Sequence, residues 1–194
     1  MLYLVRHGRT LANAERRLQG RVDNPIDEVG REQVTALSGA LGQVDRVVCS
    51  PLLRARQTAA AFGPEPEIDD RWQEIDYGVM DGVRLADVPR EVMRGWLDDP
   101  DYAPEGGETL HQMKERVWAA CADLMDDARD REVVVVTHAT PIRAAVAWAM
   151  GVDVTAAWRC HVDQASITRI VIRDHHPVLA GFNSVPVGGA PEAQ

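Results

Sequence analysis

Three short apolar runs stand out along the chain, LYLVR at 2–6, RVVCS at 46–50 and EVVVVT at 132–137. Continuous runs of this length are typical of strands that are buried on both faces of a parallel sheet. Each run is followed by a polar turn and a helical pattern, in LANAERR, PLLRARQTAAAF and PIRAAVAWAM. This alternation predicts an α/β fold, a three-layer α/β/α sandwich around a mostly parallel sheet.

The rest of the pattern adds helices and a late hairpin. Residues 28–41 and 108–128 have helical periodicity, whereas SITRIVI and PVLAGFN read as two strands joined by a turn at 173–176, at an edge of the sheet. Ser50-Pro51 and Thr140-Pro141 each combine an N-cap residue with a proline, so they predict two helix starts.

We expect one domain over residues 1–194, because a chain of this length can bury a single sufficient core. The proline-rich, acidic segment within 76–107 is less regular and predicts a small helical cap. The tail VPVGGAPEAQ at 185–194 is expected to fray.

Composition narrows the class of protein. Hydrophobic residues make up 45% and charged residues 26% of the chain, which is typical of soluble globular domains. No apolar run could cross a bilayer, and the start MLYLVRHG does not resemble a secretory signal, so we expect a cytoplasmic protein without a membrane partner. A net charge of −9 disfavours nucleic acid as a partner.

Candidate chemistry gathers where the predicted strands end. Arg6 and His7 end the first strand, Arg54 follows the second, and His138 ends the third. Because ligands of open parallel sheets bind beyond the carboxyl ends of the strands, we expect these side chains to meet at one edge.

Two arginines and two histidines suit a phosphoryl group. Arginine can donate forked, charge-assisted hydrogen bonds to phosphate oxygens, and Arg54 lies in the first turn of a predicted helix, where free N–H groups favour an anion. A histidine beside guanidinium groups is held uncharged, so it can attack phosphorus. This reasoning does not decide whether His7 or His138 is the nucleophile.

A phosphoryl transfer also needs an acid that protonates the leaving oxygen. Glu74, in the loop RWQEIDYG, is the best candidate, and Asp76 and Asp81 in the same stretch are the alternatives.

Metal chemistry is not indicated. The chain has six histidines but neither an HExxH motif nor a close cluster of histidine and aspartate, and arginines in the pocket would repel a cation. The three cysteines lack CxxC spacing, so a zinc knuckle is not predicted either. We therefore predict no metal and no cofactor.

The ordered motifs LVRHGRTLAN, LQGRVDNPIDEVG, CSPLLRARQTA, EIDYGVMDG, PEGGET and VVVVTHATPIR resemble those of the histidine phosphatase (phosphoglycerate mutase-like) superfamily. This resemblance implies that His7 becomes phosphorylated, that Arg6, Arg54 and His138 form the phosphate pocket, and that Glu74 is the proton donor. It also implies that three further residues lie beside the phosphoryl group or the substrate, namely Asn13, Gln19 and Gly20.

The resemblance further implies a metal-independent phosphatase that acts on small-molecule phosphomonoesters. A mutase of the phosphoglycerate type is the main alternative, and a non-catalytic protein that binds a phosphorylated ligand is a more distant one. Mutases of the family have a longer insertion between the acid and the second histidine, and a basic tail. Here that interval is short, and residues 185–194 contain no Lys or Arg, which favours the phosphatase. The sequence predicts neither the substrate nor the oligomeric state.

Overall fold

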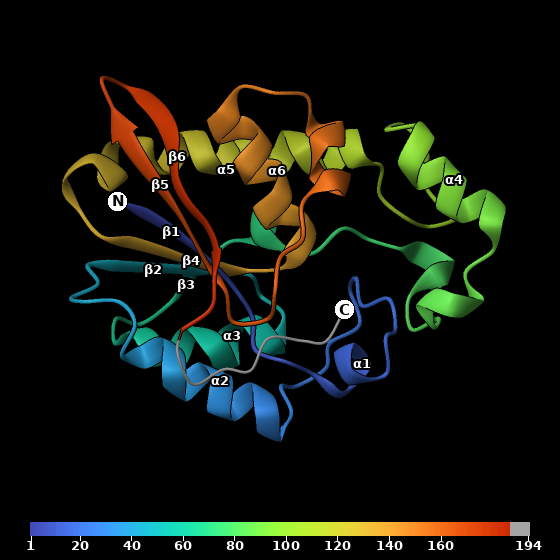
Figure 1. The fold of residues 1–194 in the computed structure, drawn as a ribbon, viewed down its shortest axis with the longest axis horizontal. Helices are drawn as coiled ribbons and strands as arrows, with labels where there is room; N and C mark the ends of the chain where they lie inside the picture. Colours follow the sequence, from blue (N-terminus) through green and yellow to red (C-terminus); the bar gives the residue numbers. More distant parts are fainter. Residues whose placement is uncertain (187–194) are drawn as a thin grey trace.

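The computed structural model describes residues 1–186, so the predicted fraying of the tail from residue 187 onward lies outside the described residues. Its centre is a six-stranded sheet in the order β3-β2-β4-β1-β5-β6 (Figure 1). The strands β3, β2, β4 and β1 pair in parallel, and β5 and β6 add two antiparallel pairings at one side. The bounds of the strands are β1 Leu2–Arg6, β2 Arg46–Cys49, β3 Glu67–Ile68, β4 Val133–Thr137, β5 Ile167–Arg173 and β6 His176–Ser184. The predicted sheet and its edge hairpin are confirmed.

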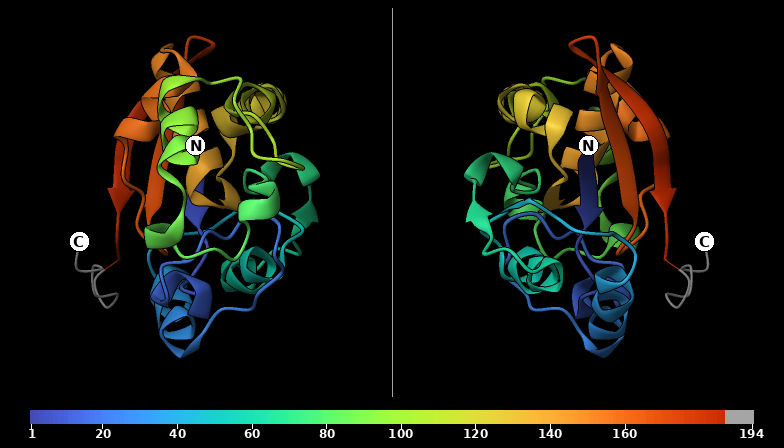
Figure 2. Two further views of the ribbon diagram at one scale, coloured as in Figure 1. Left: turned by 90° about the vertical axis from the view of Figure 1, so that its right-hand side faces the viewer. Right: turned by 90° about the vertical axis from the view of Figure 1, so that its left-hand side faces the viewer.

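Helices cover both faces of the sheet, as Figures 1 and 2 show. Helices α2 and α3 lie on one face, and α5 and α6 lie on the other. The bounds of the helices are α1 Leu11–Ala14, α2 Glu28–Ser38, α3 Leu53–Ala59, α4 Arg90–Asp98, α5 Leu110–Asp130 and α6 Ala139–Met150. The predicted three-layer α/β/α architecture is therefore confirmed.

The central strand β4 shows why a continuous apolar run forms a strand here. All four of its valines have no exposed surface. Val133 and Val135 pack into the core beneath α5 and α6, while Val134 and Val136 pack into the core beneath α2 and α3. Successive side chains of a strand point to opposite faces, so a strand between two helix layers must be apolar at every position. Each buried valine contributes about 1.5–3 kcal/mol.

Both predicted helix starts at proline are wrong by two residues. Helix α3 begins at Leu53 with Leu52 as its N-cap, and α6 begins at Ala139 with His138 as its N-cap. Pro141 therefore occupies the third position of α6, which a helix tolerates because N–H groups of its first turn have no intrahelical partner. The hydroxyl of Ser50, expected to cap α3, accepts from the backbone N–H of Leu52 at 3.4 Å and lies 2.8 Å from Nε2 of His138.

Residues 76–107, which we call the cap segment, contain two 3₁₀ turns and α4. A small separate core forms here around Val88, Val92 and Trp96. The segment is joined to the loop after α1, because the backbone N–H groups of Gly20 and Arg21 donate to the carboxylate of Asp81 at 2.6 and 2.9 Å. This contact ties the cap segment to a loop that borders the carboxyl edge of the sheet.

The first turn of α2 lies directly against the backbone that follows β1. A Cβ added at Gly30 would lie 2.2 Å from the carbonyl oxygen of Arg9, closer than atoms can approach. Only glycine allows this packing, and it fixes the segment that carries His7 and Gly8.

We predict that Gly30→Ala lowers the free energy of unfolding by about 2 kcal/mol, because backbone atoms must shift to admit the methyl group. Gly39→Ala is the matched control, since it is the C-cap of the same helix with open space around it. Urea unfolding of both variants tests the prediction. Equal stability of the two variants would show that the close approach to Arg9 carries no cost.

Candidate active site

The carboxyl edge of the sheet brings the two histidines together. Arg6 at the end of β1 is paired in register with Thr137 at the end of β4, so the next residues, His7 and His138, are neighbours. Their ring centroids are 5.0 Å apart. Arg54 reaches the same place from the first turn of α3, with its Nε 3.2 Å from Nδ1 of His138. The structure thus assembles the four residues that the sequence predicted to meet.

His7 is buried with one ring nitrogen already engaged. Its Nδ1 lies 2.8 Å from the carbonyl oxygen of Gly8. A carbonyl can only accept, so Nδ1 carries the proton and Nε2 keeps a lone pair. Within residues 1–186, Nε2 of His7 has no hydrogen-bond partner. The pKa of His7 is lowered well below its ordinary value. Burial is the largest cause, and the positive charges of Arg54 and Arg6 add to it.

His138 differs because both of its ring nitrogens are engaged. Arg54 donates to Nδ1, since a guanidinium has no acceptor, so Nε2 must be the protonated nitrogen that donates to Ser50 Oγ at 2.8 Å. Burial, followed by the charge of Arg54, lowers the pKa of His138 well below its ordinary value. Of the two histidines, only His7 has a ring nitrogen without a partner in the part of the chain that the structure describes.

Arg54 is completely buried, and much of its guanidinium binds backbone. Its Nη atoms donate to the carbonyl oxygens of Gln19, Gly20 and Val22 at 3.3, 2.9 and 2.8 Å. Burial lowers the pKa of Arg54 to about 10, which leaves it charged near neutral pH. Arg54 therefore orients His138 and holds the loop at 19–22, in addition to placing positive charge beneath the pocket.

The start of α3 was expected to be open to a phosphate, and here the structure differs. The backbone N–H of Leu53 donates to the carboxylate of Asp23 at 2.6 Å. A carboxylate of the protein thus already binds this N–H group, and it is the kind of anion that a helix start favours.

A pocket of about 180 Å³ opens in front of His7. Its lining comes from six parts of the chain: the end of β1, helix α1, the loop after α1, the loop after β3, the start of α6 and the loop before β5. The lining residues are Arg6, His7, Asn13, Arg17, Leu18, Gln19, Glu74, Tyr77, Ala139, Thr140, Arg143, His161 and Val162.

Asn13 and Gln19 lie in this lining, whereas Gly20 lies behind it. Oε1 of Gln19 lies 2.7 Å from Oγ1 of Thr10, while its buried Nε2 has no hydrogen-bond acceptor among the described residues. Oδ1 of Asn13 accepts from the backbone N–H of Thr10 at 3.1 Å. Gly20 packs against Ile75, whose carbonyl oxygen would lie 2.6 Å from an added Cβ.

Among the three candidate acids, only Glu74 lines the pocket. It is buried, and the backbone N–H of Thr140 in the first turn of α6 lies 3.3 and 3.4 Å from its two carboxyl oxygens. Asp81 instead binds the loop at Gly20, and Asp76 accepts from the backbone N–H of Gly78 at 2.8 Å. The carboxylates of Asp76 and Asp81 therefore accept hydrogen bonds from backbone N–H groups, Asp76 within the cap segment and Asp81 from the loop after α1.

Sequence reasoning missed Arg143, Tyr77, Arg17 and His161, which also line the pocket. Arg143 follows Ala139 by four residues, a spacing that places both on one face of a helix, so it could have been found. Burial raises the pKa of Tyr77, which keeps its phenol protonated. Arg17 and His161 come from loops, and no periodicity points to them.

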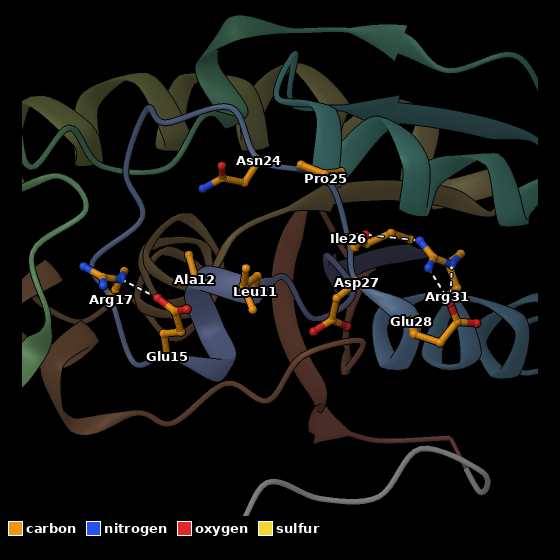
Figure 3. Close-up of a pocket in the computed structure, with 10 residues that line it drawn as sticks. All are labelled: Leu11, Ala12, Glu15, Arg17, Asn24, Pro25, Ile26, Asp27, Glu28 and Arg31. Carbon is orange, nitrogen blue, oxygen red and sulfur yellow. Dashed lines mark hydrogen bonds and ion pairs between the residues drawn. The ribbon is translucent and has the colours of Figure 1, made fainter.

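Another cavity, of about 480 Å³, lies between α1 and the start of α2 (Figure 3). Four of its charged side chains pair with one another, and Asp27 pairs with Arg9 outside the lining. Arg17 bonds to Glu15 at 2.6 Å, and Arg31 pairs with Glu28. Arg17 lines both cavities.

Residues 1–186 contain no group of three or more histidine, cysteine, aspartate and glutamate side chains placed to hold a metal ion. Within the same residues, every helix is too short or too polar to cross a bilayer.

A family model of the histidine phosphatase superfamily (branch 1) matches residues 2–185. The chain belongs to this superfamily. The sequence motifs had indicated the same family, and that prediction is confirmed.

Curated relatives of the superfamily include proteins with different names. Bifunctional protein Rv2228c of Mycobacterium tuberculosis is 34% identical over 86% of the chain, and the chain spans only 49% of that relative's length. A Salmonella newport protein named "Probable phosphoglycerate mutase GpmB" is 30% identical, with 93% of the chain and 89% of the relative covered.

Solved structures of the superfamily are also similar. Mycobacterial glucosyl-3-phosphoglycerate phosphatase Rv2419c, solved with VO3, has a TM-score of 0.85 and 29% identity over 94% of this chain and 98% of its own. A phosphoserine phosphatase mutant of Entamoeba histolytica in complex with phosphoserine has a TM-score of 0.87 and covers 95% and 96% of the two chains. At 24% identity, the latter supports the fold alone.

We predict that His7 stays uncharged when the pH falls through 6.5. Its pKa is lowered in the folded chain, so the stability that comes from a neutral imidazole is complete above the unfolded pKa, about 6.5, and decreases below it. A ¹⁵N NMR titration, assigned with His7→Gln, measures the midpoint, which should lie below that of the urea-unfolded chain. Equal midpoints would show that burial and the arginines do not act on this ring.

Proposed function

We propose that this chain hydrolyses phosphate monoesters of small metabolites through a phosphohistidine on His7. Membership of the histidine phosphatase superfamily and the phosphatase neighbours support a hydrolase. The observation that supports the assignment to His7 is its Nε2 lone pair, which is uncommitted within residues 1–186 and belongs to a residue of the pocket lining. His138 lacks such a nitrogen.

In the first step, Nε2 of His7 attacks phosphorus and the bond from phosphorus to the ester oxygen breaks. Glu74 gives its proton to the departing oxygen, which leaves as an alcohol. In the second step, a water molecule attacks phosphorus, its proton passes to Glu74, and the bond to Nε2 breaks. Inorganic phosphate leaves, and His7 and Glu74 return to their starting states.

The positive charge that the phosphoryl oxygens need comes from arginines. Arg6 lines the pocket, while Arg54 and the N–H-bearing His138 lie beneath it. Charge fixed in a buried site stabilises the transition state more strongly than charge in water. We therefore propose that no metal or other cofactor is required.

The loop after α1 supplies neutral donors. The buried, unpaired Nε2 of Gln19 needs an acceptor, which a phosphoryl oxygen would provide. Asn13 lies in the same lining. Gly20 acts through the backbone, because its carbonyl oxygen accepts from Arg54 at 2.9 Å.

A mutase is the second candidate, because one relative carries that name. A mutase must keep water away from its phosphohistidine until a second acceptor arrives. The interval from Glu74 to His138 holds only a short cap segment, which favours hydrolysis.

We predict that brief exposure to a ³²P-labelled substrate, in the presence of a chelator, labels the wild-type chain on His7. His7→Ala should lose both the label and turnover, because the displacement loses its nucleophile. Base-stable label in the wild type, located by peptide mapping, is the readout. Label on His138, label that persists in His7→Ala, or a requirement for added metal would each refute this mechanism.

We predict that Glu74→Gln slows phosphoenzyme formation by about a hundredfold to ten-thousandfold with alkyl phosphates, which release a basic alkoxide. With nitrophenyl phosphate the loss should be mild, because a phenolate can leave without a proton. Single-turnover measurements avoid a limit set by the second step. Asp76→Asn is the matched control, from the same loop but outside the pocket lining. Equal losses on both substrates would contradict proton donation by Glu74.

A further inference from the structure

Arg143 is a pocket arginine that the mechanism above does not use. It lies in the second turn of α6, and with Ala139 and Thr140 it forms the wall of the pocket on that side. Residues spaced by three and four share one helix face, which explains why these three side chains line the same cavity.

Among the described residues, no acidic side chain forms an ion pair with Arg143. Three arginines line the pocket, and they differ in their partners. Arg17 forms an ion pair with Glu15 at 2.6 Å, and Arg6 donates to the carbonyl oxygen of Val162 at 2.5 Å. Within residues 1–186, Arg143 forms no ion pair, and its Nε is buried without an acceptor. A buried, unsatisfied guanidinium N–H is costly unless a ligand supplies the acceptor.

The order of groups along α6 shows which part of the substrate Arg143 meets. His138, the N-cap, lies beside His7, where the phosphoryl group is transferred. Thr140 contacts Glu74, which marks the position of the leaving oxygen. The Cα of Arg143 lies roughly 4.5 Å farther along the helix axis than that of Thr140. Because helical side chains lean back toward the N-terminus, its guanidinium still reaches the pocket. It is therefore placed for the alcohol portion of the substrate, on the side of the ester oxygen away from His7.

We propose that Arg143 binds a carboxylate on the alcohol portion, so that the substrates are phosphate monoesters of small hydroxy acids. This inference rests on the proposed phosphatase function. A guanidinium binds a carboxylate with two parallel hydrogen bonds. A carboxylate fits better than a second phosphate, because the pocket of about 180 Å³ is smaller than the 300–1,000 Å³ typical of ligand sites.

Two matched pairs of substrates isolate the carboxylate. Phosphoserine differs from phosphoethanolamine only by that group, and 3-phosphoglycerate differs from glycerol 3-phosphate by a carboxylate in place of a hydroxymethyl group. In at least one pair, wild-type kcat/KM should favour the acid on the order of tenfold to a hundredfold. Arg143→Gln should remove this preference by slowing the acid alone. Arg143→Lys should retain part of it, because a point charge remains without the fork.

Nitrophenyl phosphate, which has no carboxylate, serves as the internal reference, and Arg173→Gln in the exposed hairpin is the control variant. Unchanged hydrolysis of this ester by Arg143→Gln shows that the variant is folded and that the phosphoryl chemistry is intact. Wild type that hydrolyses this ester without preferring either acid overturns the inference and leaves the proposed function standing. Equal loss on acids, neutral esters and nitrophenyl phosphate also overturns it. Wild type without activity on any ester refutes the proposed function itself.

Discussion

The parallel pairing of β1 with β4 is the constraint on which the site depends. Because Arg6 and Thr137 are in register, the chain must place His7 and His138 side by side wherever the two strands end. The pairing itself is held by apolar side chains, since every valine of β4 is buried between two helix layers. The same hydrophobic burial that stabilises the fold thus sets the distance between the two rings.

Burial then gives the two histidines different chemistry. Both rings are removed from water next to Arg54, so the pKa of each is lowered and both are held neutral. Their hydrogen bonds divide the roles. The carbonyl of Gly8 fixes the proton of His7 on Nδ1, whereas Arg54 and Ser50 occupy both nitrogens of His138. In the proposed mechanism, His7 attacks phosphorus, whereas both ring nitrogens of His138 stay bound to Arg54 and Ser50.

The same burial explains why the loop after α1 is held from two sides. Arg54 binds its carbonyl groups from the first turn of α3, and Asp81 binds its N–H groups from the cap segment. A buried guanidinium needs acceptors, and the loop carbonyls provide them. The same loop places Gln19 in the pocket lining. The position of the Arg54 charge and the shape of the pocket wall therefore depend on each other.

The sequence by itself determined the layers, the central strands and the four residues at their ends, because strand burial and the ends of parallel strands are local consequences of an apolar run. It also identified the family, and Glu74 as the leading acid. It misplaced the starts of α3 and α6, because proline is acceptable at several positions of a first turn. Only the tertiary structure of residues 1–186 decided which histidine keeps a free nitrogen there, which carboxylate faces the pocket, and that Arg143 forms no ion pair within these residues. Those properties depend on contacts between segments far apart in the chain, such as Arg54 with His138, Asp81 with Gly20, and Glu74 with α6, and no local pattern records them.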